Sequence, residues 1–155
     1  MPEGGLSIRW PDPPVEQEMR LYNYKISSVR AFTAANNINR LIFDSKKPRL
    51  GIVTAGKAYL DTLQALTNLG IDASEADRIG LRLLKIGMPW PLETDIVKKF
   101  ADGLEEILVV EEKRAVIEGQ LKEQLYNFEA SKRPKVVGKS TEHGELLLPS
   151  AGELT

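Results

Sequence analysis

The feature that most constrains the fold is a repeated alternation of short apolar runs with amphipathic helical stretches. The runs that we predict to be strands cover residues 50–54, 81–86, 107–110 and 134–138. The third run, Ile107–Val110, is continuously apolar, as a strand covered on both faces requires. Strand–helix–strand units connect through right-handed crossovers and build a parallel sheet. The sequence therefore predicts a three-layer, Rossmann-like α/β fold with a mostly parallel sheet and helices on both faces.

The intervening stretches carry helical periodicity. Pro14 to about Asn37 is predicted to be helical, with a possible break at Ser27-Ser28. A second helix has one apolar side and ends at Gly70, a third opens at Pro91, and a fourth has apolar residues at four-residue steps. The residues expected to face inward are Tyr59, Leu60, Leu63, Leu66 and Leu69, then Leu92, Ile96, Val97 and Phe100, and then Ile117, Leu121 and Leu125.

These elements divide the chain into three parts. Residues 1–47 are predicted to form a lead-in and an N-terminal helical segment, residues 48–138 the α/β domain, and residues 139–155 a C-terminal linker. The loops at the carboxyl ends of the strands gather at one edge of such a sheet, where ligands or partners bind. We therefore expect the functional residues in the loops that follow Thr54, Gly87, Val110 and Gly138.

Composition excludes several classes of function. The 155 residues carry a net charge of -1, so neither nucleic acid nor an anionic membrane is an expected partner. The chain has no cysteine, which rules out a disulfide framework, a thiolate metal site and an iron–sulfur cluster within it. His143 is the single histidine, and no metal ligands are assigned. With no apolar run long enough to span a bilayer and no basic, apolar start, the expected location is cytoplasmic.

One stretch imitates a phosphate-binding loop. Gly51 to Gly56-Lys57 has the spacing of a P-loop, but Ala58 stands where a serine or threonine should hold magnesium. Gly51 also falls inside the predicted strand, which leaves few loop residues to wrap a phosphate. A tight strand-to-helix turn is the favoured interpretation, with Thr54, Gly56 and Lys57 as an anion or partner contact at the helix N-terminus.

Two further loops carry candidate contact residues. Glu111-Glu112-Lys113-Arg114 follows the most apolar strand, and we expect a salt-bridged turn at the start of a helix rather than an acid–base pair. Trp90 lies between two prolines and is either an interface anchor or folded back over its own domain. The lead-in residue Trp10 is equally ambiguous.

Several segments together resemble the fused-chain bacterial indolepyruvate:ferredoxin oxidoreductases of the 2-oxoacid:ferredoxin oxidoreductase family. They are residues 14–25, 50–61, 85–93, 104–114 and 120–127, and the resemblance runs from about residue 12 to residue 138. It implies a transketolase C-terminal-like domain, whose sheet has an antiparallel edge strand. Either Arg40–Phe43 or Leu146–Leu148 is expected to supply that strand.

The resemblance also implies a function. The complete enzymes oxidatively decarboxylate an aryl 2-oxoacid to an acyl-CoA, with thiamine diphosphate, Mg²⁺ and 4Fe-4S clusters as cofactors and coenzyme A as co-substrate. Expected partners are neighbouring thiamine-binding domains, ferredoxin, and further copies of the enzyme in a homo-oligomer. In this chain the nearest match to the family's Gly-Asp-Gly magnesium motif is Ala101-Asp102-Gly103, which we interpret as a helix C-cap. No catalytic or cofactor-binding residue is therefore assigned.

The resulting hypothesis is a non-catalytic structural and interface domain of such an oxidoreductase. The alternatives are a P-loop-like nucleotide-binding protein and a stand-alone protein-interaction module.

Overall fold

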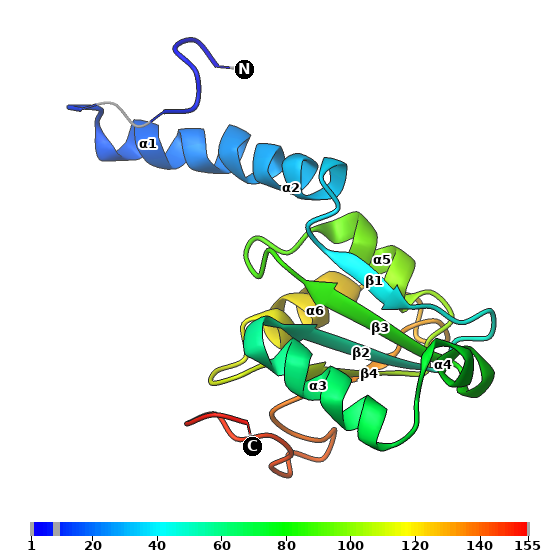
Figure 1. Ribbon diagram of the computed structural model, residues 1–155. Coiled ribbons are helices and arrows are strands. Elements are labelled where there is room, and N and C mark those ends of the chain that lie inside the picture. Colours follow the sequence, from blue (N-terminus) through cyan, green and yellow to red (C-terminus); the bar gives the residue numbers. More distant parts are fainter. Residues whose placement is uncertain (1, 8–9, 155) are drawn as a thin grey trace.

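The computed structural model describes residues 2–7 and 10–154, and they form a five-stranded sheet beside a long N-terminal helix (Figure 1). The strands are β1 (Arg40–Phe43), β2 (Leu50–Ala55), β3 (Leu81–Ile86), β4 (Glu106–Val110) and β5 (Lys135–Val137). Their order is β1-β3-β2-β4-β5. β2, β3, β4 and β5 run parallel, whereas β1 is antiparallel to β3. The predicted α/β class is confirmed.

The antiparallel edge strand is β1, which decides between the two expected segments. The other candidate, Leu146–Leu148, contributes only an isolated bridge between Ser140 and Leu146. β1 pairs Arg40 with Lys85 and Leu41 with Leu84, and its register shifts before Phe43. A short, irregular edge strand of this kind discourages further strand pairing.

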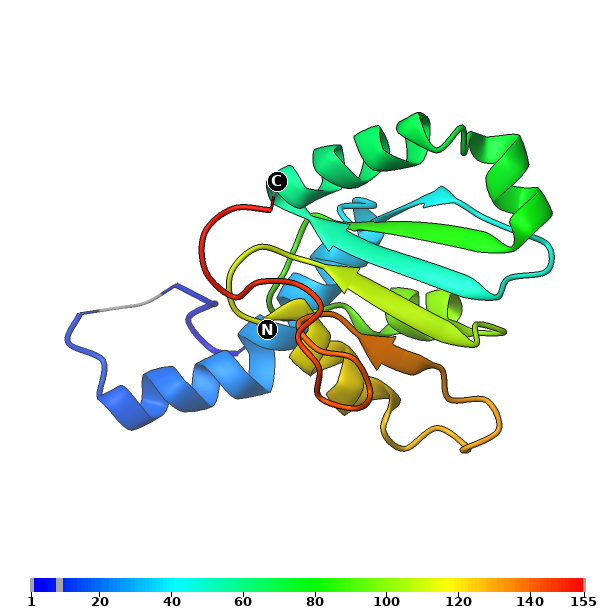
Figure 2. The same ribbon diagram turned by 90° about the horizontal axis from the view of Figure 1, so that it is seen from below.

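The helices form a layer on each face of the sheet (Figures 1 and 2). α3 (Gly56–Asn68) and α4 (Ala73–Ile79) cover one face, and α5 (Thr94–Ala101) and α6 (Ile117–Leu125) cover the other. On the central strand, Ile52 packs on the α3 side and Val53 on the α6 side. This alternation explains why the central strands are apolar on both faces.

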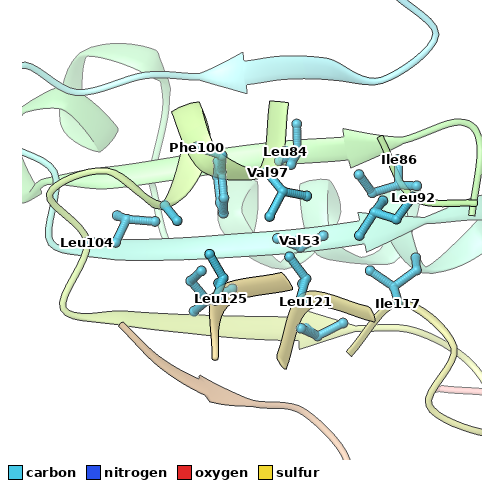
Figure 3. Close-up of a cluster of buried hydrophobic side chains, with 13 residues drawn as sticks. Val53, Leu84, Ile86, Leu92, Val97, Phe100, Leu104, Ile117, Leu121 and Leu125 are labelled. Carbon is cyan, nitrogen blue, oxygen red and sulfur yellow. The ribbon is translucent and has the colours of Figure 1, made fainter. Parts of the chain in front are cut away.

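The larger core cluster lies between the sheet and the pair α5 and α6 (Figure 3). Val53 and Leu84 from the sheet meet Phe100 of α5 and Leu121 of α6, and all four side chains are almost fully buried. Each side chain of this kind contributes about 1.5–3 kcal/mol to folding by leaving water. The core therefore fixes the positions of the loops that join these elements.

The inward face of α3 differs from the predicted one. Leu60 and Leu69 are 63% and 73% exposed, so their assignment to the inward side is wrong. Leu66 is buried as predicted, and Tyr59 and Leu63 are partly buried against the core. Ala58 and Thr62 are also buried and were not predicted. The predicted inward stripe was too wide, because only the residues that face β2 and β4 are covered. The end of the helix at Gly70 is confirmed, with a φ of 72°.

Helix α4 was not predicted from the sequence. It is a short helix in which only Ala76 is buried, so apolar periodicity gives almost no signal. Its caps are nevertheless visible in the sequence. The carboxylate of Asp72 accepts the backbone N–H of Glu75 at 2.9 Å, and Gly80 ends the helix in the left-handed conformation.

Helix α5 begins at Thr94, three residues after the predicted start at Pro91. The carboxylate of Glu93 accepts the backbone N–H groups of Asp95 at 2.6 Å and Ile96 at 2.9 Å. A capping side chain sets a helix start more strongly than a proline, because it satisfies N–H groups that otherwise have no partner. Pro91 therefore belongs to the loop that leads into the helix.

The N-terminal helical segment, Pro14–Ala35, is one continuous helix that we call the arm. It consists of α1 (Pro14–Arg20), a π-helical turn η1 (Leu21–Lys25) and α2 (Ile26–Ala35). Ser27 and Ser28 donate to the carbonyl of Tyr24 at 2.9 and 2.8 Å and do not interrupt the helix, so the predicted break is wrong. Serine satisfies its hydroxyl on the preceding turn and so remains within a helix. Both views show the arm projecting past the sheet (Figures 1 and 2).

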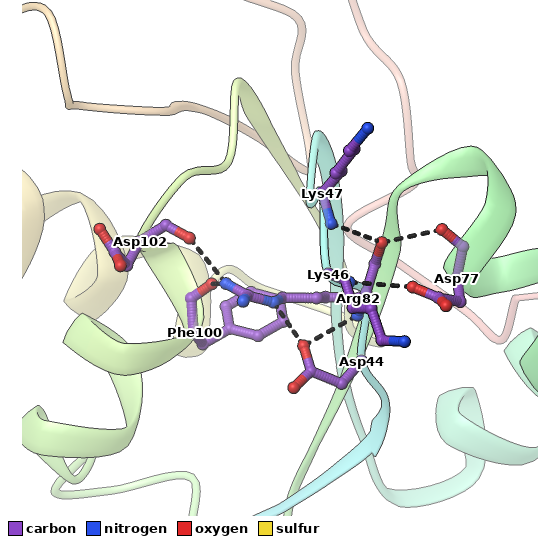
Figure 4. A network of polar contacts seen from close by, with 8 residues as sticks. Asp44, Lys46, Lys47, Asp77, Arg82, Phe100 and Asp102 are labelled. Atoms are coloured by element: carbon purple, nitrogen blue, oxygen red, sulfur yellow. Dashed lines mark hydrogen bonds and ion pairs between the residues drawn. The ribbon is translucent and has the colours of Figure 1, made fainter.

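A polar network fastens the connection between β1 and β2 (Figure 4). Nε of Arg82, a residue of β3, donates a hydrogen bond to Oδ1 of Asp44 at 2.7 Å. The guanidinium group of Arg82 also donates to the backbone carbonyls of Phe100 and Asp102. Asp77 of α4 accepts the backbone N–H of Lys46 at 2.9 Å, and this hydrogen bond lowers the pKa of Asp77. The network lies at the end of the sheet opposite the carboxyl ends of β2, β3 and β4.

Candidate functional site

The carboxyl ends of the parallel strands meet at one edge of the sheet, which we call the carboxyl edge (Figure 2). The turn after β2, the loop 87–93 and the loop 111–116 lie there. The predicted contact residues are distributed over these three loops. The structure places some of these residues on the surface and buries others, and the physical cause differs from loop to loop.

The turn between β2 and α3 is too short to hold a phosphate. β2 runs through Ala55 and α3 starts at Gly56, so no loop wraps around an anion. Gly56 has a φ of 57°, which confirms the predicted tight turn that needs glycine. The side chain of Thr54 is fully buried within β2, so this residue does not contribute to a contact surface.

Gly51, the first glycine of the P-loop-like spacing, is explained by packing. A Cβ atom at this position would lie 2.5 Å from Cδ1 of Leu104 and 2.7 Å from Cζ of Phe100. Glycine is therefore required because Phe100 and Leu104 approach β2 closely. The close packing at Gly51 and the absence of a loop after β2 explain the P-loop-like spacing of the glycines without a bound nucleotide.

Lys57 lies at the start of α3 among carboxylates. Its Nζ is 3.0 Å from Asp61, 3.7 Å from Glu112 and 3.9 Å from Glu153. The hydrogen bond to Asp61 raises the pKa of Lys57, and the charges of Glu112 and Glu153 act in the same direction. Lys57 is thus a paired cation that links α3 to the loop 111–116 and to the C-terminal segment.

Glu111 is buried and caps helix α6. Its carboxylate oxygens accept the backbone N–H groups of Val116, Ile117 and Glu118 at 2.9–3.1 Å. The N-terminus of a helix has N–H groups without partners and a partial positive charge, and a carboxylate satisfies both. Glu111 therefore holds the loop 111–116 in shape and is not exposed to a reacting molecule.

The predicted salt bridges within the turn are wrong. Among the ion pairs of residues 2–7 and 10–154, none joins Lys113 or Arg114 to Glu111 or Glu112. Glu111 bonds the backbone of α6 instead, and the cation nearest to Glu112 is Lys57. Lys113 adopts a positive φ of 58°, and its side chain and that of Arg114 are exposed. These two cations stand at the carboxyl edge facing solvent.

A buried polar cluster behind this loop was not predicted. Glu118 of α6 accepts the backbone N–H of Lys139 at 2.9 Å and pairs with Lys122 at 2.6 Å. Nζ of Lys139 donates to the carbonyls of Glu111 and of Pro149, the latter at 3.0 Å. The only sequence signal is Gly138, where a Cβ atom would lie 2.5 Å from Oε2 of Glu118.

This cluster also fastens the C-terminal segment. The backbone N–H of Leu147 donates to the carbonyl of Lys139 at 2.9 Å, and the carbonyl of Leu154 accepts from Lys57 at 3.4 Å. Residues 139–154, predicted to be a linker, therefore run along the domain and reach the start of α3. The predicted boundary at residue 138 stays a prediction.

The loop that carries Trp90 is held from both sides. Oδ1 of Asn39 accepts the backbone N–H groups of Gly87 and Met88 at 2.9 and 3.1 Å. Gln120 of α6 donates to the carbonyl of Pro89 at 2.7 Å and accepts the N–H of Leu92 at 2.8 Å. The indole of Trp90 is nevertheless 56% exposed. The ring therefore projects from a fixed backbone, and its role as an interface anchor stays a prediction.

The two remaining candidate residues, Asp102 and His143, make only structural contacts or surface contacts. Asp102 is the C-cap of α5, as predicted, with its N–H bonded to the carbonyl of Lys98. His143 lies 4.0 Å from Glu142 on the surface. Within residues 2–7 and 10–154, no three His, Asp or Glu side chains come close enough together to hold a metal ion. Among those residues there is also no helix with the length and apolar character to cross a bilayer.

The fold and this edge define an open α/β domain whose buried carboxylates cap helices and whose exposed aromatic and basic residues face outward. The chain belongs to the family described as the indolepyruvate ferredoxin oxidoreductase middle domain, whose sequence model matches residues 39–154.

Curated relatives support this assignment. The chain is 33% identical over 107 residues to the indolepyruvate oxidoreductase subunit IorA of Pyrococcus horikoshii, covering 69% of this chain and 14% of that subunit. It is 33% identical to the IorA subunit of Thermococcus kodakarensis over the same shares of both chains. The IorA subunit of Methanothermobacter marburgensis is 30% identical over 97 residues, covering 63% of this chain and 14% of the subunit. The chain thus spans about a seventh of the relatives' length.

Two solved structures are similar to part of this chain. A split-gene transketolase, described as an inactive β4 tetramer, has a TM-score of 0.49 and 17% identity over 64% of this chain and 31% of its own. A 2-oxoglutarate:ferredoxin oxidoreductase from Magnetococcus marinus, solved with 2-oxoglutarate, coenzyme A and succinyl-CoA, has a TM-score of 0.41 and 16% identity over 76% of this chain and 20% of its own.

Proposed function

We propose that this chain is a non-catalytic structural and interface domain of a cytoplasmic, thiamine-diphosphate-dependent 2-oxoacid:ferredoxin oxidoreductase. The enzyme would oxidatively decarboxylate an aryl 2-oxoacid of the indolepyruvate type to an acyl-CoA and pass the electrons to ferredoxin. Family membership supports the enzyme class, and the small share of the relatives that the chain covers supports a larger, multidomain protein.

The observation that carries the interface role is the presentation of Trp90. The loop backbone is fixed by Asn39 and Gln120, while the indole projects into solvent. An aromatic side chain on a rigid loop loses little conformational freedom on binding and buries a large area. The exposed cations Lys113 and Arg114 stand on a loop at the same edge and would form the polar rim of such a contact.

The carboxylates of the carboxyl edge support a structural rather than a chemical role. Glu111 caps α6, Glu118 binds the backbone of Lys139, and Glu112 lies beside Lys57. The described residues do not fit the thiamine diphosphate and Mg²⁺ group, because Asp102 ends a helix and no cluster of metal ligands is formed. In this proposal that group and the 4Fe-4S clusters are held by other domains of the enzyme. This domain then sets the spacing of its neighbours, on which catalytic rates depend steeply.

The test is a pair of tryptophan substitutions in the full-length oxidoreductase that contains this domain. Trp90→Ala is expected to lower 2-oxoacid-dependent reduction of ferredoxin by about 10-fold or more and to weaken assembly, because the interface loses its anchor. Trp10→Ala is the matched control, since Trp10 lies in the lead-in and not on a loop of the carboxyl edge, and it is expected to change neither property. Unchanged activity and assembly of the Trp90→Ala enzyme would remove the proposed interface.

A further inference from the structure

One face of the arm forms an open groove that the domain leaves uncovered. The groove has a volume of about 500 Å³ and runs along the N-terminal half of the helix. Its lining includes Val15, Leu21 and Tyr22, with Glu18 and Lys25 beside them. Val15 and Tyr22 are each 64% exposed, and this half of the arm extends away from the sheet (Figure 1).

The lead-in contacts one wall of the groove and the opposite side of the helix. At the wall, the side-chain amide of Gln17 donates to the carbonyl of Asp12 at 2.9 Å. Arg20 donates to the carbonyls of Gly5 at 3.4 Å and Ser7 at 3.5 Å. Arg20 follows Glu18 by two positions, so the two side chains point to nearly opposite sides of the helix, about 200° apart. The face with Val15, Glu18 and Tyr22 therefore stays open when the lead-in is folded against the arm.

Most helical stability in proteins comes from the packing of an apolar face. Exposed apolar residues along one face mark a surface for another protein. The ring of Tyr22, a residue that is 64% exposed, enlarges this apolar area. Binding of a partner to this exposed apolar face would therefore stabilise the arm.

The charges on this face are arranged so that the face complements itself. Glu18 stands toward the N-terminal end of the groove and Lys25 at the other end. They are seven residues apart, which corresponds to about 10 Å along the helix. When two such faces are placed antiparallel about Leu21 and Tyr22, Glu18 of each copy faces Lys25 of the other. The two apolar centres then lie against each other.

We propose that the arm pairs antiparallel with the arm of a second copy of this chain. The contact is isologous, so each ion pair and each apolar contact occurs twice across a two-fold axis near Leu21. Leu21 and Tyr22 supply the apolar contact, and the Glu18–Lys25 pairs fix the antiparallel orientation. This inference does not depend on the proposed enzyme class, since it rests on the arm alone.

The test is sedimentation equilibrium of the chain and of charge-reversed variants at low salt. The wild-type chain is expected to show a concentration-dependent monomer–dimer equilibrium. Glu18→Lys and Lys25→Glu each place like charges opposite one another twice, and each is expected to raise the dimer dissociation constant by about 10-fold. The double variant Glu18→Lys with Lys25→Glu restores opposite charges and is expected to return to within about 3-fold of wild type.

Two controls make the result specific. Trp90→Ala leaves the arm intact and is expected to dimerise as wild type does, which separates this contact from the proposed domain interface. Circular dichroism at the same concentrations shows whether each variant keeps its helix content. A wild-type chain that stays monomeric up to about millimolar concentration would overturn the proposal. Folded single variants that dimerise as tightly as wild type, or a double variant no tighter than the singles, would also overturn it.

Discussion

Replacing Glu111 by alanine tests whether this buried carboxylate is part of the fold. Its oxygens accept the backbone N–H groups of Val116, Ile117 and Glu118, and the residue is only 6% exposed. The substitution leaves these donors without the carboxylate at the start of α6. An unsatisfied buried donor costs about 1–3 kcal/mol, and water entering the space left by the side chain recovers part of this cost.

We therefore expect Glu111→Ala to lower the free energy of unfolding by about 3 kcal/mol. For a chain of this size the loss corresponds to a fall in the melting temperature of about 6–12 °C. Urea denaturation followed by circular dichroism measures the difference. If Glu111→Ala does not fold, Glu111→Gln provides the measurement, because its amide oxygen still accepts a hydrogen bond and a smaller loss is expected.

The matched control is Glu112→Ala at the next position. Glu112 lies 3.7 Å from Lys57 and makes a partly exposed ion pair, so its removal is expected to cost less than about 1 kcal/mol. Equal stability of the Glu111→Ala and wild-type chains, or equal losses for both substitutions, would refute the capping role. The carboxylate would then be free for another function, and the structural interpretation of the loop 111–116 would fail.

Three further substitutions test other parts of the structure. Gly51→Ala forces a Cβ atom against Leu104 and is expected to destabilise the chain by about 1–3 kcal/mol in urea denaturation; an unchanged midpoint would contradict the close packing. The lowered pKa of Asp77 means that its contribution is present above the ordinary aspartate pKa and is lost as pH falls through the lower folded value. Asp77→Asn should therefore lower the urea midpoint near neutral pH but not at about pH 2, and a constant difference would contradict this linkage. Lys139→Ala removes the bond to the carbonyl of Pro149 and should speed hydrogen exchange in residues 147–154 by about 10-fold. The exposed Lys132→Ala, whose ion pair is with Glu129, should not, and equal rates in both variants would refute this role of Lys139.

The sheet could be predicted from the sequence because its strands are apolar on both faces. Ile107–Val110 is a short continuous apolar run, and Leu81–Ile86 is apolar except for Arg82 and Lys85. Parallel strands buried between two helix layers require such runs. The identity of the edge strand could not be predicted from the sequence, since Arg40–Phe43 and Leu146–Leu148 are both short and largely apolar. Only pairing with β3 distinguishes them, and pairing depends on residues far apart in the chain.

The carboxyl edge could be located from the sequence but its contacts could not. The loops after the strands contain Lys57, Trp90 and Glu111, as expected for this fold. Which charges meet there depends on packing: Glu111 turns inward to α6, and Lys57 reaches Glu112 in another loop. Neighbours in sequence suggested a salt bridge with Arg114, whereas the actual partners come from other elements.

The packed C-terminal segment had no sequence signal of its own. Residues 139–154 lack helical or strand periodicity and are held by backbone contacts and by the side chains of Lys57, Lys135 and Lys139. The π-helical turn within the arm was also not visible, because the hydrophobic pattern of residues 14–35 is compatible with a regular helix. Features that depend on backbone hydrogen bonding rather than on apolar periodicity are those that the sequence left undetermined.

The central claim is that the chain positions other domains and does not itself hold the cofactor. Calorimetric titration of the chain with magnesium thiamine diphosphate tests this claim most directly, with circular dichroism showing that the chain is folded. The account predicts no binding heat, because the carboxylates of the carboxyl edge are engaged in capping and pairing. Binding at about micromolar affinity or tighter would contradict it.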